Sequence, residues 1–506
     1  MSDVAASPEL NNLRRGMIMT SVVLAATLYS TTLVIASTLL PQIQGAMAAT
    51  PDEVAWVMTF NILATAVVTP MTGWLVGCFG RRGVMVGSVL LFTLSTYLCG
   101  AAESLETLIL WRILQGATGA PVTPLSQTVL FDTFSRQYQR IVTSIYGMTV
   151  VLGPIIGPVL GGYLTDMYSW RWAFYLLVPI GLASAIGLQF SMLRDTRRQP
   201  VRLDWLGFLS LAAAISFMQL ALSRGPRLDW YDSPEVWLET IGAIVAFYVF
   251  LAHSLTAKNP FLHLRLLLDR NYALGLALVT VFGMLNVTPM VLLPPLLRQN
   301  MGYPDSLIGE ILAWRGVGGV VGFFLASFVG RLDPRVGMSA GFGLQVVSGL
   351  WLMSIDLNVD THTLMANSAI QGGATALIWV PLTIVGFSTL DSEHWPEAMS
   401  VFHLMRNIGS SFFISMCVAE MVRSATANYS RLNEMISPFN RQLSLPWVMG
   451  GWTTETDPGL ARLAQEINRQ AVMIGYLRAF TLYTAASAAA LLLVVVVRSR
   501  GRTLPT

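Results

Sequence analysis

Residues 147–162 read GMTVVLGPIIGPVLGG, and this stretch decides the fold class of the chain. Five glycines and two prolines stand among apolar residues, although inside a helix in water Gly costs about 1 kcal/mol and Pro about 3 kcal/mol relative to Ala. Such a helix is stable where lipid and neighbouring helices force its backbone groups to bond internally. Gly153, Gly157 and Gly161 repeat at a spacing that lets helix backbones touch. The stretch therefore predicts a closely packed transmembrane helix.

The composition of the whole chain points the same way. Of its 506 residues, 54% are hydrophobic and 12% are charged, and the mean hydropathy is +0.59. A soluble domain carries about 25% charged residues, so we expect an all-α, polytopic membrane protein. The three cysteines have no metal-ligand spacing, and no nucleotide-binding loop is present. The sequence therefore predicts no metal, no cofactor and no nucleic-acid partner.

Apolar runs of about 20 residues, the length that crosses a bilayer, predict fourteen transmembrane helices. They lie at 17–40, 54–77, 84–101, 107–130, 141–164, 172–193, 204–223, 236–255, 272–297, 307–330, 336–354, 362–387, 398–422 and 474–497. Spans 1–6 and 9–14 are expected to form two equivalent six-helix halves, and spans 7 and 8 an inserted pair, because many transporters are built from repeated halves. The predicted domains are 1–193, 194–260 and 261–506.

The loop charges predict the orientation of the chain. Arginines gather in alternate loops, for example at Arg14, Arg81 and Arg335, and short loops on the other side carry mainly acids. The positive-inside rule then places both termini in the cytoplasm. Segment 423–473 is predicted to be a long outer loop whose part after Pro458 has a helical, amphipathic pattern. This loop is interpreted as a folded cap or docking segment, with a disordered connector as the alternative.

Several motifs resemble those of the major facilitator superfamily, specifically its fourteen-span drug/proton antiporters of the EmrB/QacA type. Residues 147–162 are similar to the antiporter motif Gly-x-x-x-Gly-Pro-x-x-Gly-Pro-x-x-Gly-Gly, and residues 73–83 (GWLVGCFGRRG) to the loop motif after span 2. The resemblance implies the major facilitator fold and export across a bacterial inner membrane. It assigns conformational roles to Gly73, Gly77, Gly80, Arg81, Arg82, Gly153, Pro154, Gly157, Pro158, Gly161 and Gly162.

Charged and titratable residues inside the spans are candidates for proton coupling. An intramembrane Arg costs about 2.5–3.5 kcal/mol on insertion scales, so it needs a partner or a watery cavity. Arg112 stands in a sequence similar to the family's Arg-x-x-Gln-Gly motif, whose Arg the resemblance links to proton transfer. Glu310 is the first choice for the proton carrier, the alternative being a Glu wetted from outside. The full set is Arg112, Glu310, Arg315, His403 and Arg406.

One departure from the family pattern concerns the energy source. The family usually has an Asp in span 1, but this region reads YSTTL at residues 29–33 and contains no acid. That Asp is the family's leading candidate for proton binding. An uncoupled or differently coupled facilitator of the same fold is therefore the main alternative to a proton antiporter.

Polar amides inside the spans are candidates for the substrate cavity. Each is costly in lipid, so each is expected to face the bundle interior. The residues are Asn61, Gln115, Gln127, Asn286, Asn367, Gln371 and Asn407. Methionines and aromatic residues, which suit varied apolar ligands, are plentiful, with 24 Met and 23 Phe.

The sequence thus predicts a multidrug exporter that works by alternating access, not an enzyme. Its expected partners are a lipophilic small molecule, the proton and membrane lipid. The resemblance also implies a periplasmic adaptor and an outer-membrane channel docked through the long loop. A membrane-embedded lipid enzyme is disfavoured because no paired His, metal motif or nucleophile elbow is present. A non-transporting accessory subunit is disfavoured by the cost of the intramembrane arginines.

Overall fold

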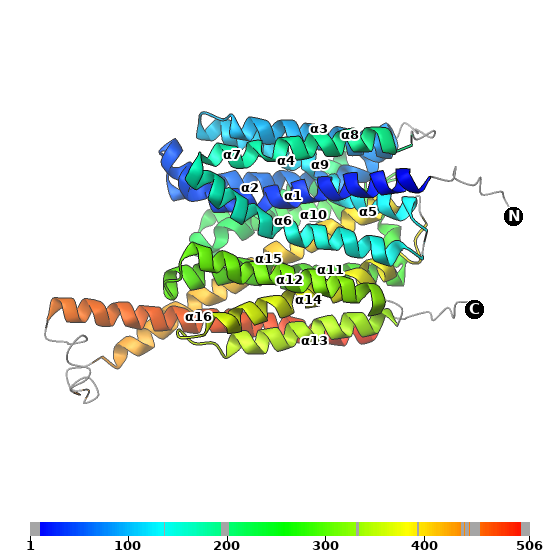
Figure 1. Cartoon of the computed structure of the whole chain (residues 1–506). Helices are drawn as coiled ribbons and strands as arrows, with labels where there is room; N and C mark the ends of the chain where they lie inside the picture. Colours follow the sequence, from blue (N-terminus) through cyan, green and yellow to red (C-terminus); the bar gives the residue numbers. More distant parts are fainter. Residues whose placement is uncertain are drawn as a thin grey trace.

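The computed structural model describes residues 11–135, 137–193, 202–329, 333–391, 394–436, 440, 445 and 456–496. These residues form a bundle of long helices that run roughly side by side (Figure 1). Helix α1 begins and helix α16 ends at the same end of the bundle, which we call the N/C end. Helices α15 (Trp395–Glu434) and α16 (Asp457–Val496) project together from the opposite end, the hairpin end.

The first half of the bundle is built around α1, which packs against α6 and α8. A left-handed turn at Gly80, with φ of 77°, interrupts α3 between predicted spans 2 and 3; glycine adopts this conformation without steric cost. The elements are α1 (Asn12–Met47), α2 (Pro51–Val68), η1 (Thr69–Met71), α3 (Thr72–Gly100), α4 (Leu105–Gly119), α5 (Val122–Thr133), α6 (Gln139–Met167), α7 (Trp170–Tyr175) and α8 (Leu177–Ser191).

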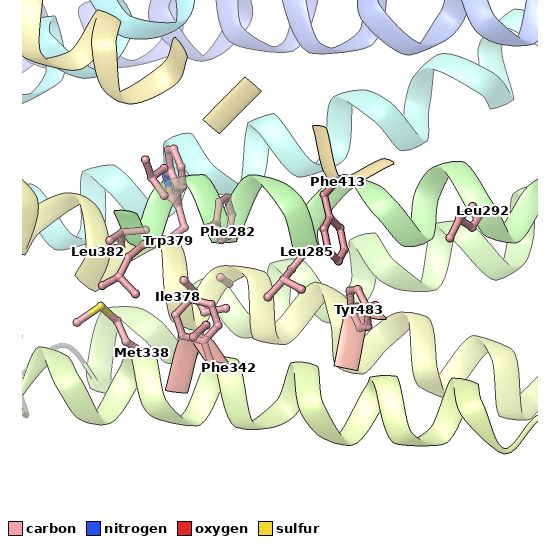
Figure 2. Close-up of a cluster of buried hydrophobic side chains, with 14 of the residues drawn as sticks. Phe282, Leu285, Leu292, Met338, Phe342, Ile378, Trp379, Leu382, Phe413 and Tyr483 are labelled. Atoms are coloured by element: carbon pink, nitrogen blue, oxygen red, sulfur yellow. The ribbon is translucent and has the colours of Figure 1, made fainter. Parts of the chain in front are cut away.

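The inserted pair and the second half follow. The pair packs helix against helix, and α12 packs against α14 in the second half. The elements are α9 (Trp205–Arg224), η2 (Gly225–Arg227), η3 (Trp230–Asp232), α10 (Pro234–Thr256), η4 (Leu264–Leu268), α11 (Arg270–Pro295), η5 (Leu296–Asn300), α12 (Asp305–Val329), α13 (Pro334–Met353), α14 (Thr361–Gly386), α15 and α16. Figure 2 shows part of the core of this half, where Phe282 of α11 lies beside Trp379 of α14 with ring centroids 5.2 Å apart.

The helices confirm an all-α, multi-pass membrane protein. Within the described residues, 11 segments are long and apolar enough to cross a membrane. One of them, Glu53–Gly100, is 48 residues long and holds two predicted spans. Predicted spans 4 and 6 are each divided into two shorter helices, α4 and α5 at Pro121, which lacks a backbone N–H, and α7 and α8 at Leu176. The fourteen-span prediction fits this arrangement.

The predicted loop 423–473 is more helical than the sequence suggested. Helix α15 continues to Glu434, and α16 already begins at Asp457, so two helix ends occupy much of the loop. The helical pattern after Pro458 is thus confirmed. Residues 437–439, 441–444 and 446–455 lie outside the described part, as do the domain boundary at 194–201 and the basic loop 330–332.

The inserted pair covers the junction between the two halves. Leu211 and Ile215 of α9 join a buried apolar cluster with Ala66 of α2 and Leu404 of α15. At the hairpin end, Ser415 of α15 donates a hydrogen bond of 2.5 Å to the Leu222 carbonyl of α9. The pair therefore contacts both halves along one side of the bundle.

The glycine-rich stretch 147–162 lies in α6 and contacts both halves. A Cβ on Gly153 would lie 2.5 Å from the Ser30 Cβ of α1, and one on Gly157 would lie 3.0 Å from the Thr31 carbonyl oxygen. Helices α1 and α6 are thus in backbone contact, as small-residue packing requires. Gly147 lies directly against the Phe323 ring of α12. The side chains of Pro154 and Pro158, and position Gly162, lie outside the described residues.

Substitution of Gly153 by Ala should destabilise the bundle, because its Cβ would displace α1 from α6 and overpacking costs about 1–3 kcal/mol. Gly343→Ala is the matched control, since a Cβ at Gly343 of α13 would meet nothing within 4 Å. Thermal unfolding of the purified protein, followed by dye labelling of the buried Cys99 and Cys417, should show a lower midpoint for Gly153→Ala alone. Equal midpoints for the two variants would contradict the close α1–α6 contact.

Candidate functional site

The first half holds a buried arginine within a network of neutral groups. Arg112 of α4 is 0% exposed, and its guanidinium donates to Gln115 Oε1 at 2.5 Å. Gln115 Nε2 donates to the Thr96 hydroxyl at 2.8 Å, and Asn61 Nδ2 of α2 donates to the Arg112 carbonyl at 2.8 Å. Asn61, Gln115 and Arg112, which the sequence assigned to different roles, therefore form one network. It holds a positive charge with uncharged oxygens as its acceptors.

The second half contains a comparable network. Arg315 of α12 donates to Gln371 Oε1 at 2.7 Å and to Asn286 Oδ1 at 2.8 Å. Gln371 Nε2 donates to Asn367 Oδ1 at 2.8 Å, and Asn367 Nδ2 donates to the Ser348 carbonyl at 3.0 Å. Two predicted cavity residues, Asn286 and Gln371, thus accept hydrogen bonds from Arg315 within its own half, and a third, Asn367, holds Gln371 in place.

The two networks occupy matching places in the halves. Gly116, which follows Gln115 in α4, lies directly against the Asn61 carbonyl of α2. Gly372, which follows Gln371 in α14, lies directly against the Arg315 carbonyl of α12. Each half therefore has a Gln-Gly pair on one helix packed against a polar residue on the other. The arginine stands beside the Gln on α4 in the first half and on the opposite helix in the second.

A third group of residues lies where the halves meet. We call it the inter-half seam and define it by Tyr29, Gln127, Tyr146 and Gly147 of the first half and Phe323, His403 and Arg406 of the second. His403 Nε2 and Gln127 Oε1 are 2.8 Å apart, and the two residues are each 2% exposed. Among the described residues, His403 Nδ1 and Gln127 Nε2 have no hydrogen-bond partner. A titratable side chain thus bridges the halves, and two buried nitrogens of this pair are left without a hydrogen-bond partner among the described residues.

Arg406 is the charged residue of the seam. Its guanidinium lies 5.8 Å from the ring centroid of Trp379 and donates to Asn407 Oδ1 at 3.2 Å. It interacts electrostatically with the phenols of Tyr146 and Tyr29 in the opposite half. Among the described residues, no carboxylate lies within ion-pairing distance of Arg406, although part of its surface remains accessible.

The N/C end of the bundle is held together by what we call the N/C latch, formed by Gly73, His263 and Glu397. Glu397, in the first turn of α15, accepts hydrogen bonds from the His263 backbone N–H at 2.6 Å and approaches His263 Nδ1 to 3.0 Å. A Cβ on Gly73 of α3 would lie 3.1 Å from the Glu397 Cβ. Beside the latch, Phe131 of α5 and Trp395 of α15 meet edge to face with centroids 5.7 Å apart.

The electrostatics of the latch favour a charged His263. The hydrogen bond that the His263 ring donates to the Glu397 carboxylate raises the pKa of His263 above its usual value, although partial burial opposes this. His263 is 51% exposed, so solvent screens the pair. The stabilisation is complete below the ordinary His pKa of about 6.5 and is lost as the pH rises through the higher pKa of the folded state.

Other predicted residues lie away from the seam. Glu310 is exposed near the start of α12, so it lacks the burial expected of a proton carrier. Arg81 pairs with Asp132 of α5, and Arg82 donates to the Gln189 carbonyl of α8 at 2.5 Å. These contacts join helices of the first half at the N/C end.

Sequence reasoning missed the latch residues Glu397 and His263 and the seam phenols Tyr29 and Tyr146. Glu397 carries a local signal, because it follows Trp395-Pro396 at a helix start, where acids are favoured. The pairing of His263 with Glu397 spans 134 positions in sequence, and the phenols come from helices far apart in the chain. Neither the His263–Glu397 contact nor the position of the two phenols in the seam can be recognised from a local pattern in a single sequence.

The helical bundle with two matching halves and a polar seam defines a multi-pass membrane transporter. The family model for the Major Facilitator Superfamily matches residues 22–414. The chain is 32% identical to the multidrug export protein EmrB of Escherichia coli (strain K12) over 449 residues, 87% of each chain. The chain therefore belongs to the major facilitator superfamily, in its EmrB-type group, as the sequence motifs predicted.

Two further proteins are similar to this chain, one in sequence and one in structure. The chain is 29% identical to the fatty acid resistance protein FarB of Neisseria gonorrhoeae over 418 residues, 81% of each chain. The crystal structure of the human organic anion transporter MFSD10 aligns with a TM-score of 0.60 and 12% identity, covering 96% of this chain and 100% of that chain. The structural match confirms the fold.

Loss of the imidazole should loosen the latch in a pH-dependent way. His263→Gln should speed alkylation of Cys78, which is half-buried in α3 near Gly73, because the contact with Glu397 is weakened. The ratio of variant to wild-type rates should be greatest near pH 6, where His263 is charged, and should fall towards one as the pH rises through the raised pKa of His263. His362→Gln, an exposed position at the start of α14, is the control; a pH-independent ratio would contradict this account.

Proposed function

We propose that this protein exports hydrophobic or amphipathic small molecules by alternating access, its two halves rocking about the inter-half seam. The observation that carries the proposal is the seam itself, a buried polar boundary between two halves in which Arg112 and Arg315 each bond to side chains of their own half. Each half can then move as a unit, since its polar network remains intact while seam contacts change. Relatives named for multidrug export and for fatty acid resistance support a lipophilic cargo.

The membrane orientation follows from the loop charges. We place the N/C end, which carries Arg14, Arg81 and Arg82, on the cytoplasmic side of a bacterial inner membrane. The α15–α16 hairpin then projects into the periplasm. In this orientation the N/C latch closes the cytoplasmic side, and opening the latch is the step that admits cargo from the cytoplasm.

The energy source proposed is the proton gradient, with His403 as the coupling residue. His403 is the titratable side chain that bridges the halves, and imidazole titrates near neutral pH in water. A proton added to the closed seam would place a second positive charge near Arg406, which has no carboxylate partner among the described residues. Proton binding therefore favours an open, wetted seam, and closure expels the proton. Glu310 is a weaker choice because it is exposed.

A periplasmic partner is the remaining element of the proposal. The hairpin presents helix from Arg423 to Glu434 and from Asp457 onward, beyond the predicted spans. We assign this hairpin to a periplasmic adaptor that connects the transporter to an outer-membrane channel. Deletion of residues 430–470 should abolish co-purification of an adaptor without affecting insertion of the bundle.

An uncoupled facilitator of the same fold is the second candidate function. The lack of an acid at residues 29–33 favours it, because the usual proton site of the family is missing. Such a protein would move cargo only down its own gradient. The two candidates differ in whether a pH gradient alone accumulates the cargo.

Inside-out vesicles that contain the protein should accumulate a lipophilic dye when their lumen is acidified, because protons leaving the lumen drive cargo inward. Addition of nigericin, which removes the pH difference, should return the dye to its equilibrium level. Accumulation that persists in full after nigericin would rule out proton coupling. Entry that only equilibrates the dye would identify the facilitator.

Replacing His403 by Asn should uncouple transport, because Asn keeps a hydrogen-bonding group towards Gln127 but cannot carry a proton. We expect accumulation driven by a pH gradient to fall at least roughly tenfold, while exchange of cargo down its own gradient continues. Glu310→Gln is the comparison variant and should remain coupled. Coupled transport in His403→Asn together with uncoupling in Glu310→Gln would move the proton site to Glu310.

A further inference from the structure

The charges within the bundle are unbalanced in sign. Arg112, Arg315 and Arg406 lie inside helices that form the spans, whereas the described acids lie in loops, towards helix ends or, like Glu420 of α15 and Glu466 of α16, at or beyond the outer end of a predicted span. Glu310 stands near the start of α12 and is exposed, and Glu239 of α10 pairs with Arg224. An uncompensated positive charge in a medium of low dielectric attracts anions strongly. The interior is therefore electrostatically suited to a negative guest.

Of the three arginines, only Arg406 is placed to meet a guest. Arg112 and Arg315 are 0% and 4% exposed, and each donates hydrogen bonds of 2.5–2.8 Å to side-chain oxygens of its own half. Arg406 makes a single longer bond, 3.2 Å to its neighbour Asn407, and keeps accessible surface although it lies within the bundle. Most of its donor capacity is unused among the described residues.

The surroundings of Arg406 are aromatic and come from both halves. The Trp379 ring lies under the guanidinium, and Trp379 itself packs against Phe282 and Phe402 with centroids 5.2 and 5.9 Å away. From the other half, Tyr29 and Tyr146 lie within electrostatic range of the same charge. A flat apolar body can pack on such rings while its charged group binds the guanidinium.

We propose that Arg406 is the specificity-determining residue of the seam and that it selects amphipathic organic anions, compounds with an aromatic or aliphatic body and one carboxylate or sulfonate. This inference rests on the proposed export function and adds the charge of the cargo. The anion neutralises Arg406 when it binds, so the seam can close around the loaded site without burying an unpaired charge. A cation of the same shape meets repulsion from Arg406 and finds no carboxylate within the described seam.

The test compares two bicyclic probes of similar size and permanent charge, naphthalene-2-sulfonate and N-methylquinolinium. Permanent charge keeps passive leakage low, so uptake into inside-out vesicles reports the protein. Wild type should accumulate the sulfonate in preference to the quinolinium. Arg406→Gln should reduce sulfonate uptake roughly tenfold or more, and Arg406→Lys should retain part of it because Lys keeps the charge but loses the planar fork.

Arg423→Gln is the matched control, because Arg423 lies on the same helix but is exposed at the hairpin end; it should leave uptake of both probes unchanged. Membrane levels and thermal midpoints of all variants separate loss of binding from loss of folding. If Arg406→Gln is unstable, a second experiment on the wild-type protein tests the proposal: the sulfonate should compete with uptake of a neutral dye. The absence of competition would overturn the proposal.

The outcomes distinguish this inference from the function on which it rests. Preferential transport of the quinolinium, or unchanged sulfonate transport in Arg406→Gln, would overturn the anion proposal while leaving export intact. Absence of transport for either probe and for the neutral dye would overturn the export function and this inference together.

Discussion

Burial of positive charge without a carboxylate partner is the constraint on which this bundle depends. A guanidinium within a membrane must keep its donors satisfied or remain close to water, because desolvation of a charge is costly. Arg315 meets this requirement with Gln, Asn and backbone oxygens supplied by adjoining helices, whereas Arg112 donates to Gln115 of its own helix and to the Met58 sulfur of α2. The polar residues of each half are thereby committed to its own arginine, which makes each half a self-contained unit.

Close helix contacts at glycines make this arrangement possible. The carbonyls of Asn61 and Arg315 lie against Gly116 and Gly372, so the helices approach closely enough for the Arg–Gln networks to form. Gly153 and Gly157 do the same for α6 against α1, and Gly147 brings α6 to α12 of the other half. The α6 helix is therefore fixed to its own half at its middle and meets the second half nearer the N/C end, which suits a boundary that opens and closes.

The seam and the latch have complementary properties. The latch joins Glu397 to His263 and Gly73. These contacts can break and re-form, because His263 is partly exposed to solvent and can lose its proton. The seam contains His403 and Arg406, two groups whose charges respond to what enters the space between the halves. Glu397 of the latch and His403 and Arg406 of the seam all belong to α15, so a shift of this one helix would change the closure of the N/C end and the chemistry of the seam together. The inserted pair, packed on α15 and α2, is positioned to restrain that shift.

The sequence by itself determined the fold class, the order of the spans and the family, because apolar run length, loop charge and glycine spacing are local properties of the chain. It also identified Arg112, Arg315, His403 and most of the buried amides, since a polar residue in an apolar run is visible without a structure. Tertiary structure decided which of them meet. It bound Asn286 and Gln371 to Arg315 and Asn367 to Gln371, paired Gln127 with His403, and left Glu310 exposed. These outcomes depend on helix rotation and on contacts between different helices, with separations that range from 29 positions between Asn286 and Arg315 to 276 between Gln127 and His403, which no local pattern encodes.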